Sequence, residues 1–218
     1  MATNTEELLN RILESLSKVE YIKAEDIPNI DLYMDQVTTF MDKRLRTKTR
    51  NPGEDKILTK TMINNYAKND LLPPPEKKKY SKEHMLLLIF IYYYKSILSI
   101  NDIQTLLTPI TDEFFKTSGK VSLEDIYTEV FSMEESQMEL LKQDVRAKYA
   151  RAEETFTDVP EKDKEFLKKF SFICLLSFDV YVKKLLIEKM IDDLREQNAK
   201  TDEKVKSTEP EKDKKKEK

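Results

Sequence analysis

The sequence has few of the residues on which disulfides, zinc sites and phosphate-binding loops depend. Its 218 residues include two glycines, one cysteine, one histidine and no tryptophan. A lone cysteine, Cys174, cannot form a disulfide within the chain, and one Cys with one His cannot make a Cys/His zinc site. Gly53 and Gly119 stand far apart, which excludes a glycine-rich phosphate loop. The composition therefore predicts no metal and no cofactor.

Long hydrophobic runs are also missing. The most apolar segment, residues 170–182, contains Asp179 and is followed by two lysines, so it is shorter than the ~20 apolar residues that span a bilayer. The first residues have no apolar core of the signal-peptide type. We therefore expect a cytoplasmic protein without membrane contact. Because Lys, Glu, Leu and Ile are plentiful and glycine is scarce, the expected fold class is all-α.

Positive charge is concentrated in one part of the chain. The formal net charge is −3, yet residues 43–84 contain twelve lysines and arginines against five carboxylates. A basic segment inside an acidic protein indicates an anionic partner, although a lysine run can also merely solvate a loop. The distribution of charge, and not its total, therefore points to nucleic acid or an acidic protein.

Helical signals flank this basic segment. We expect an N-terminal arm (1–24) whose helix Thr5 caps, then a domain (25–110) with a helix over residues 32–45 and an exposed cationic loop over 46–58. A short helix follows Thr59 or Thr61, and Pro73-Pro74-Pro75 is expected to end it. Ser81 opens an apolar helix, and Ser99 opens a further helix that we expect to end at Leu107, before Pro109.

The short helix and the basic loop behind it are the candidate site. Apolar positions of this helix face inward, which leaves lysine, threonine and asparagine side chains on its outer face. Such groups suit base edges and phosphates, and the lysines after the prolines suit flanking phosphates. The predicted DNA-binding residues are Lys60, Thr61, Asn64, Asn65, Lys68, Lys77, Lys78, Lys79 and Tyr80. His84, just after them, is interpreted as a residue of the first helical turn, with phosphate contact as an alternative.

The second half of the chain reads as long helices. Apolar residues recur near heptad spacing after Ser122, with a possible kink near Ser132, and a last helix is expected over about 163–197. This region (111–200) is predicted to pair its helices with each other or with another subunit. The charged tail (201–218) is predicted to be disordered, because it has almost no apolar residues to bury.

Several phrases resemble a known family of DNA-binding proteins. Tyr66, the run Leu71-Leu72-Pro73-Pro74, the lysines 77–79 with Tyr80, and the later Leu98 to Ile103 are similar to the MerR family. Three phrases look closer to an uncharacterised bacterial MerR-like family catalogued as a domain of unknown function. They are Asp31 to Gln36, Thr59 to Tyr66 and Lys78 to His84.

The resemblance implies a winged helix-turn-helix domain followed by long C-terminal dimerisation helices. Two departures stand out: Asp70 occupies a usual glycine position, and the loop 46–58 is longer than usual. The family's metal-sensing cysteines are absent, so the resemblance does not extend to metal sensing.

Three functions from different classes follow from these features. The leading hypothesis is a sequence-specific transcriptional regulator that binds double-stranded DNA as a homodimer, with an effector that the sequence does not identify. The alternative is a helical protein-interaction module that presents the same basic face to an acidic partner protein. An enzyme that acts through carboxylates ranks last, because acidic residues at helical spacing usually form a solvated face.

Overall fold

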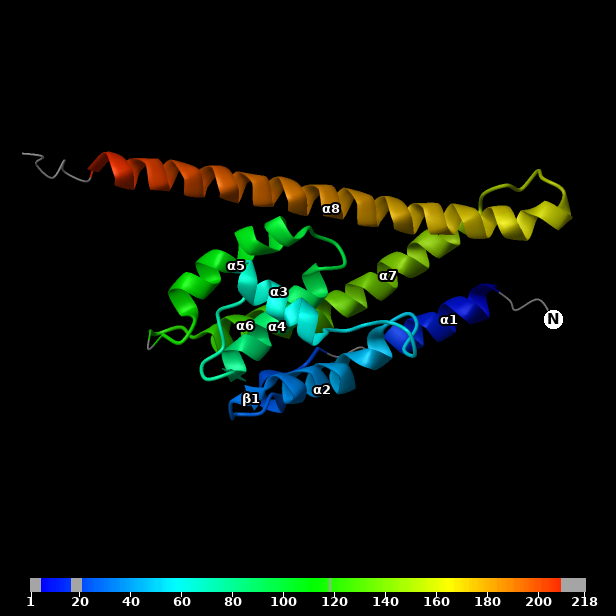
Figure 1. Ribbon diagram of the computed structural model, residues 1–218. Helices are drawn as coiled ribbons and strands as arrows, with labels where there is room; N and C mark the ends of the chain where they lie inside the picture. Colours follow the sequence, from blue (N-terminus) through cyan, green and yellow to red (C-terminus); the bar gives the residue numbers. More distant parts are fainter. Residues whose placement is uncertain (1–4, 17–20, 118, 209–218) are drawn as a thin grey trace, which may run out of the picture.

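The computed structural model describes residues 5–16, 21–117 and 119–208 (Figure 1). The described part of the chain is mostly helical and contains one two-stranded ribbon, which is consistent with the all-α prediction. The elements in chain order are α1 (Thr5–Leu16), η1 (Ala24–Asp26), β1 (Leu32–Tyr33), α2 (Met34–Leu45), η2 (Arg46–Lys48), α3 (Lys60–Lys68), β2 (Lys79–Tyr80), α4 (Lys82–Tyr94), α5 (Ile100–Phe114), α6 (Leu123–Ser132), α7 (Glu134–Glu153) and α8 (Glu161–Thr208).

Helix α4 is the centre of the structure. Every residue from 84 to 91 is buried, so the helix has no solvent-facing side over two turns. A helix that is apolar all round is expected inside a domain. Residues of α2, α3, α5 and α6 complete the same core, and we call residues 22–132 the helical domain. Residue 110, the predicted end of the domain, lies inside α5, and the core extends to Tyr127 of α6.

The ribbon joins two segments that are distant in sequence. Strand β1 pairs antiparallel with β2, and Leu32 lies opposite Tyr80. The prediction of a helix from residue 32 is therefore wrong for its first two residues. Both Leu32 and Tyr80 are buried, and burying them side by side against the core favours the extended pairing over another half-turn of helix.

Helix α3 begins as predicted but ends earlier. The Thr59 hydroxyl accepts a hydrogen bond from the Met62 amide at 3.2 Å, which is an N-cap. The helix ends at Lys68, before the prolines, because Asp70 has a φ of 53° and the Leu71 amide returns to the Tyr66 carbonyl at 2.9 Å. This is the Schellman arrangement, which terminates a helix without proline. The prediction that Pro73–Pro75 end the helix is corrected accordingly.

Helix α5 also differs from the prediction, at its C-terminal end. It begins at the predicted cap, where the Ser99 hydroxyl accepts from the Asp102 amide, but it runs through Pro109 to Phe114. Proline removes one backbone hydrogen bond from a helix. The apolar side chains of Leu107, Ile110 and Phe114 continue to pack on the core, and this packing offsets the loss.

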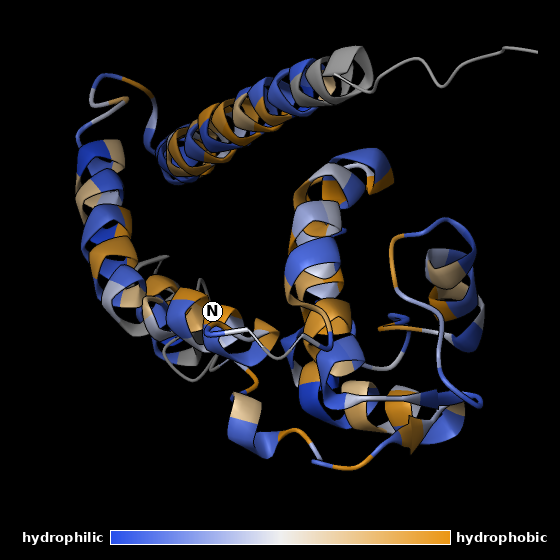
Figure 2. Cartoon of the chain, turned by 90° about the vertical axis from the view of Figure 1, so that its left-hand side faces the viewer, coloured by the Kyte–Doolittle hydropathy of each residue, from blue (hydrophilic) through white to orange (hydrophobic). Residues whose placement is uncertain are grey.

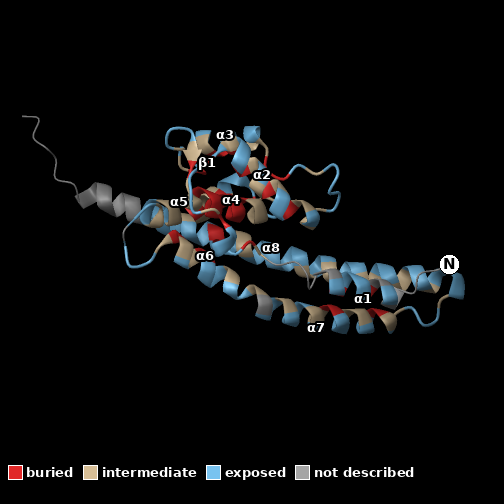
Figure 3. Ribbon diagram, turned by 90° about the horizontal axis from the view of Figure 1, so that it is seen from below, coloured by how far each residue is buried: buried red, intermediate tan, exposed pale blue. Residues whose placement is uncertain are grey.

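The C-terminal helices form an antiparallel pair. Helices α6 and α7 are separated at Met133, where a kink was predicted, and α7 and α8 then lie side by side (Figures 1 and 3). Leu9 and Leu13 of α1 pack with Val145 of α7. We call α1, α7 and the first half of α8 the bundle.

Helix α8 extends beyond the bundle to the helical domain. Ile191 is buried in the domain core, and Arg195 pairs with Asp102 of α5 at 2.6 Å. The helix continues to Thr208, into the charged segment for which disorder was predicted. Once a helix exists, each added residue gains a hydrogen bond without a new nucleation cost, and this lets a polar sequence continue it. Residues 209–218 lie outside the described part. Among the described helices, none combines the length and the apolar character needed to cross a bilayer.

Candidate nucleic-acid interface

The predicted outer face of α3 is exposed as a group. Lys60, Thr61, Asn64, Asn65 and Lys68 are all exposed, while Ile63 and Tyr66 on the other side are buried. Residues three and four positions apart share a helix face, so these five side chains lie together. We call them the α3 face. Figure 3 shows α3 and β1 on the side of the helical domain that faces away from α7.

Two lysines form the tip of the ribbon. The Lys79 amide donates to the Glu76 carbonyl at 2.8 Å, which closes a four-residue turn with Lys77 and Lys78 at its centre. Their φ angles are 49° and 65°, the left-handed region in both cases. Two successive positive φ angles define a type I′ turn, which normally takes Asn-Gly. The two exposed residues, here called the turn lysines, therefore hold strained backbone positions.

The other two predicted contact residues are less accessible. Lys79 is half-buried, and its ammonium group lies 5.2 Å from the centre of the Tyr33 ring. Tyr80 is only 3% exposed and packs edge-on against His84. Tyr80 thus anchors the ribbon to the core and is removed from the candidate interface. Its aromatic ring next to lysines resembled a contact residue, and the sequence carried no signal of its pairing with Leu32.

Neighbouring carboxylates are partly neutralised by other cations. Asp35 pairs with Lys60, and Glu76 pairs with Lys116 at 2.5 Å. Lys116 also lowers the pKa of Glu76, first through this hydrogen bond and then through its charge. Within the described residues, Lys68 and the turn lysines have no ion-pair partner. The uncompensated positive charge therefore comes from Lys68 on the α3 face and from the turn lysines, whereas Lys60 is paired with Asp35.

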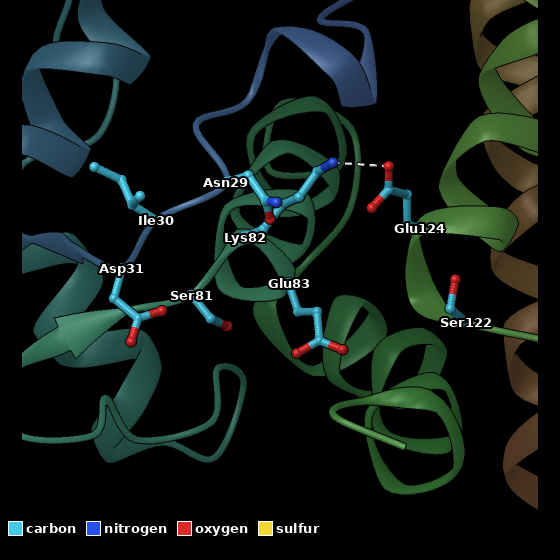
Figure 4. A pocket seen from close by; sticks show the side chains of 8 residues that line it. All are labelled: Asn29, Ile30, Asp31, Ser81, Lys82, Glu83, Ser122 and Glu124. Atoms are coloured by element: carbon cyan, nitrogen blue, oxygen red, sulfur yellow. Dashed lines mark hydrogen bonds and ion pairs between the residues drawn. The ribbon is translucent and has the colours of Figure 1, made fainter. Parts of the chain in front are cut away.

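A hollow lined by acidic residues is a further feature of the helical domain. Its volume is about 300 Å³, and the N-terminal ends of α4 and α6 border it (Figure 4). Asp31, Glu83 and Glu124 contribute carboxylates to its lining, and the ammonium group of Lys82 is bound to Glu124 at 2.7 Å. This hollow would repel phosphate. A polyanion on the α3 face would therefore not extend across it.

His84 has a structural role that the sequence did not predict in full. Its Nδ1 accepts a hydrogen bond from the Ser81 amide at 3.0 Å, so His84 completes the cap of α4. The ring is 1% exposed and lies edge-on to Phe115, with ring centres 4.8 Å apart. Burial lowers the pKa of His84. Phosphate contact by His84 is thus ruled out, and the ring instead holds the base of the ribbon against α4.

No group of three or more His, Cys, Asp or Glu side chains within residues 5–16, 21–117 and 119–208 is arranged to bind a metal ion.

The arrangement defines a helical domain with a basic helix face and a basic turn, joined to a long-helix bundle. A family model described as "Domain of unknown function (DUF1836)" matches residues 22–130, which is half of the chain. The chain therefore belongs to this family, and the matched region coincides with the helical domain. No curated protein and no solved structure matches it significantly. None of these comparisons links the chain to MerR proteins or to DNA.

Proposed function

We propose that this protein is a sequence-specific DNA-binding transcriptional regulator that acts as a dimer through a MerR-like winged helix. The observation that carries the proposal is an exposed Lys/Asn/Thr helix face and an exposed lysine turn in the same domain. Figure 3 shows α3 and β1, the strand that pairs with β2 beside the turn, on the domain side that faces away from α7. In this proposal α3 enters the major groove, and the turn lysines neutralise phosphates beside it.

The chemistry of the α3 face suits base reading. Asn64 and Asn65 carry amide groups that can bond two atoms of one adenine edge, and Lys60 and Lys68 each lie about one turn from Asn64, on either side of it. Helix α3 is short, with nine residues, and its buried side is fixed by Ile63 and Tyr66. The exposed groups are therefore held by a rigid support, as groove recognition requires.

The turn lysines supply a separate argument. Asn and Gly would fit their backbone angles with less strain, so lysine at both positions lowers stability. Strained backbone positions cluster at active sites and binding sites. Two adjacent ammonium groups at an exposed tip suit contact with a phosphate backbone.

The exposed side of α8 supports the dimeric part of the proposal. Large apolar side chains along it are strongly exposed, including Phe166 at 69%, Phe178 at 65% and Tyr181 at 64%. Figure 2 shows hydrophobic residues distributed along this helix. An apolar stripe of this extent is unusual on a monomer. Pairing of two copies would cover it and would match a palindromic DNA site.

The test is selection of bound fragments from genomic DNA. Full-length protein is incubated at low salt with fragmented DNA from its own source, and the bound fragments are sequenced. We expect enrichment of a palindromic motif, and its loss in the variant Lys77→Glu/Lys78→Glu. If about six phosphates are neutralised, log affinity should fall with log salt concentration with a slope of about −5.

A matched control separates local contact from total charge. Lys162→Glu/Lys169→Glu makes the same charge change at exposed positions of α8, far from the α3 face, and should retain enrichment. Circular dichroism of all three proteins checks folding. Absence of enrichment at low salt, or a salt slope near zero, would overturn the proposal and favour an acidic protein partner instead.

A further inference from the structure

The long loop between α2 and α3 has a defined conformation. The Asp55 carboxylate accepts a hydrogen bond from the Asn51 amide at 2.9 Å, and the Arg46 guanidinium donates to the Pro52 carbonyl while pairing with Asp42. Ile57 and Leu58 at its end are buried in the core. The sequence predicted an exposed, aperiodic segment, but these contacts fix it against the end of α2.

The loop and the end of α4 together line an open cavity. Its volume is about 470 Å³, which is within the range of small-ligand sites. Four cationic side chains and one carboxylate line it, and that carboxylate, Asp55, is already engaged by Asn51. Tyr92 and Tyr93 supply aromatic surface. The cavity therefore offers positive charge beside planar apolar groups.

Lys95 is the most constrained of these cations. It is half-buried, its ammonium group lies 4.9 Å from the centre of the Tyr92 ring, and it donates to the Ile57 carbonyl at 2.5 Å. No carboxylate among the described residues pairs with it. Burial lowers its pKa, as expected for a cation without a counter-charge. An anion in the cavity would supply that charge.

We propose that this cavity binds a small organic anion, with a carboxylate or phosphate group held by Arg50, Lys56 and Lys95 and a planar apolar body lying on Tyr92. Charge-assisted hydrogen bonds are stronger than neutral ones, and stacking on tyrosine selects a planar partner. Lys95 is half-buried, and Arg50 and Lys56 are exposed. The proposal concerns binding of a small molecule and does not depend on DNA binding.

The cavity shares no lining residue with the α3 face or the turn lysines. Helices α2 and α4 both begin at the ribbon, and the cavity lies at their other ends. Twelve and thirteen helical residues place these ends roughly 18–20 Å from the ribbon. A ligand here would contact the loop that connects α2 to α3 without covering the α3 face.

Binding is measured by calorimetry on the full chain without DNA. The probes are phenyl phosphate, benzoate and uncharged benzyl alcohol. We expect binding of at least one anionic probe, no detectable binding of benzyl alcohol, and about tenfold weaker binding of the anion to Arg50→Gln, because one charged hydrogen bond is lost. The tighter of the two anions identifies the preferred head group.

Arg50 is exposed on the loop, so its substitution leaves the core intact. Lys95→Met is a second variant that removes the half-buried charge and keeps side-chain length, and it should weaken binding at least as much. Lys162→Gln on α8 is the control and should bind like the original protein. Failure of both anions to bind at millimolar concentration, or equal binding to Arg50→Gln and the original protein, would overturn the proposal.

Discussion

Two buried tyrosine hydroxyls in the helical domain differ in their hydrogen bonding. Tyr127 is fully buried, and its hydroxyl donates to the carbonyl of Ile22, 105 positions earlier in the chain. The Tyr93 hydroxyl is also buried, but it has no hydrogen-bond partner in the described part of the chain. Burial raises the pKa of Tyr93 to about 12, so it remains neutral at physiological pH.

We expect removal of these two hydroxyls by Tyr→Phe substitution to have different effects on the free energy of unfolding. Tyr127→Phe should lower the free energy of unfolding by roughly 1–2 kcal/mol, because it leaves the Ile22 carbonyl without its buried donor. Tyr93→Phe removes an unsatisfied group and should be neutral or slightly stabilising. Urea unfolding of both variants checks this. Equal losses in the two would show that the Ile22 hydrogen bond contributes nothing specific.

At the scale of elements, the ribbon turn offers the sharpest test of local strain. Replacing both turn lysines by Asn and Gly (Lys77→Asn/Lys78→Gly) fits the type I′ turn and should raise the free energy of unfolding by about 1–2 kcal/mol. Thermal or urea unfolding measures the gain. If the proposed function is right, the same variant should bind DNA more weakly.

The control for this variant is Lys77→Ala/Lys78→Ala, which removes the same charge but keeps side chains at positive φ. It should weaken DNA binding without the gain in stability. An unchanged free energy of unfolding in the Asn/Gly variant would contradict the strain argument.

The helix starts were predictable because their causes are local. Thr59, Ser99 and Ser122 accept hydrogen bonds from amides three residues later, and such caps can be read from adjacent residues. The ribbon could not be read in this way, because Leu32 becomes a strand only through Tyr80, 48 positions away. The end of α3 at Asp70 was missed for another reason: aspartate adopts a positive φ less readily than glycine, so the three prolines gave the stronger signal.

The candidate site was predicted in part for the same reasons. Helical spacing placed the five residues of the α3 face together, whereas the burial of Tyr80 and the capping role of His84 depend on tertiary packing. The cavity beneath the loop 46–58 was not predicted, because its walls come from two segments separated by α3 and the ribbon.

At the scale of the whole molecule, a charge cluster joins the two long helices. Lys148 of α7 pairs with Asp144 in its own helix and with Asp179 of α8 at 2.7 Å. The hydrogen bond to Lys148 lowers the pKa of Asp179, and the hydrogen bond to Asp144, followed by that to Asp179, raises the pKa of Lys148. The interactions behind both pKa shifts stabilise the folded state at pH values where Asp179 and Lys148 are both charged.

This cluster predicts a pH dependence with a definite sign. The contribution of Asp179 is present above the unfolded pKa of aspartate, about 3.9, and is lost as pH falls through its lower folded value. The contribution of Lys148 is present below about pH 10.4 and is lost as pH rises through its higher folded value. The cluster should therefore stabilise the pairing of α7 and α8 from about pH 4 to 10.

Melting temperatures in a pH series test this window. Lys148→Met should melt lower than the original protein near pH 7, and the difference should shrink as the pH falls below about 4. Lys142→Met, whose partner Glu139 lies in the same helix, is the control and should show little effect on the pairing. A difference that stays constant across the whole series would show that packing of the Lys148 stem, and not its charge, is responsible.

Helix α8 is a single rod of 48 residues, about 70 Å long, and it contacts the rest of the protein at two separate places. Asp179 and its neighbours attach the rod to α7, and Ile191 with Arg195 attach it to the helical domain. A straight helix resists bending, so α8 rotates as one body. A rotation of α8 at its contact with α7 would therefore also rotate it at its contact with the helical domain. The rod thereby fixes the orientation of the α3 face relative to the bundle.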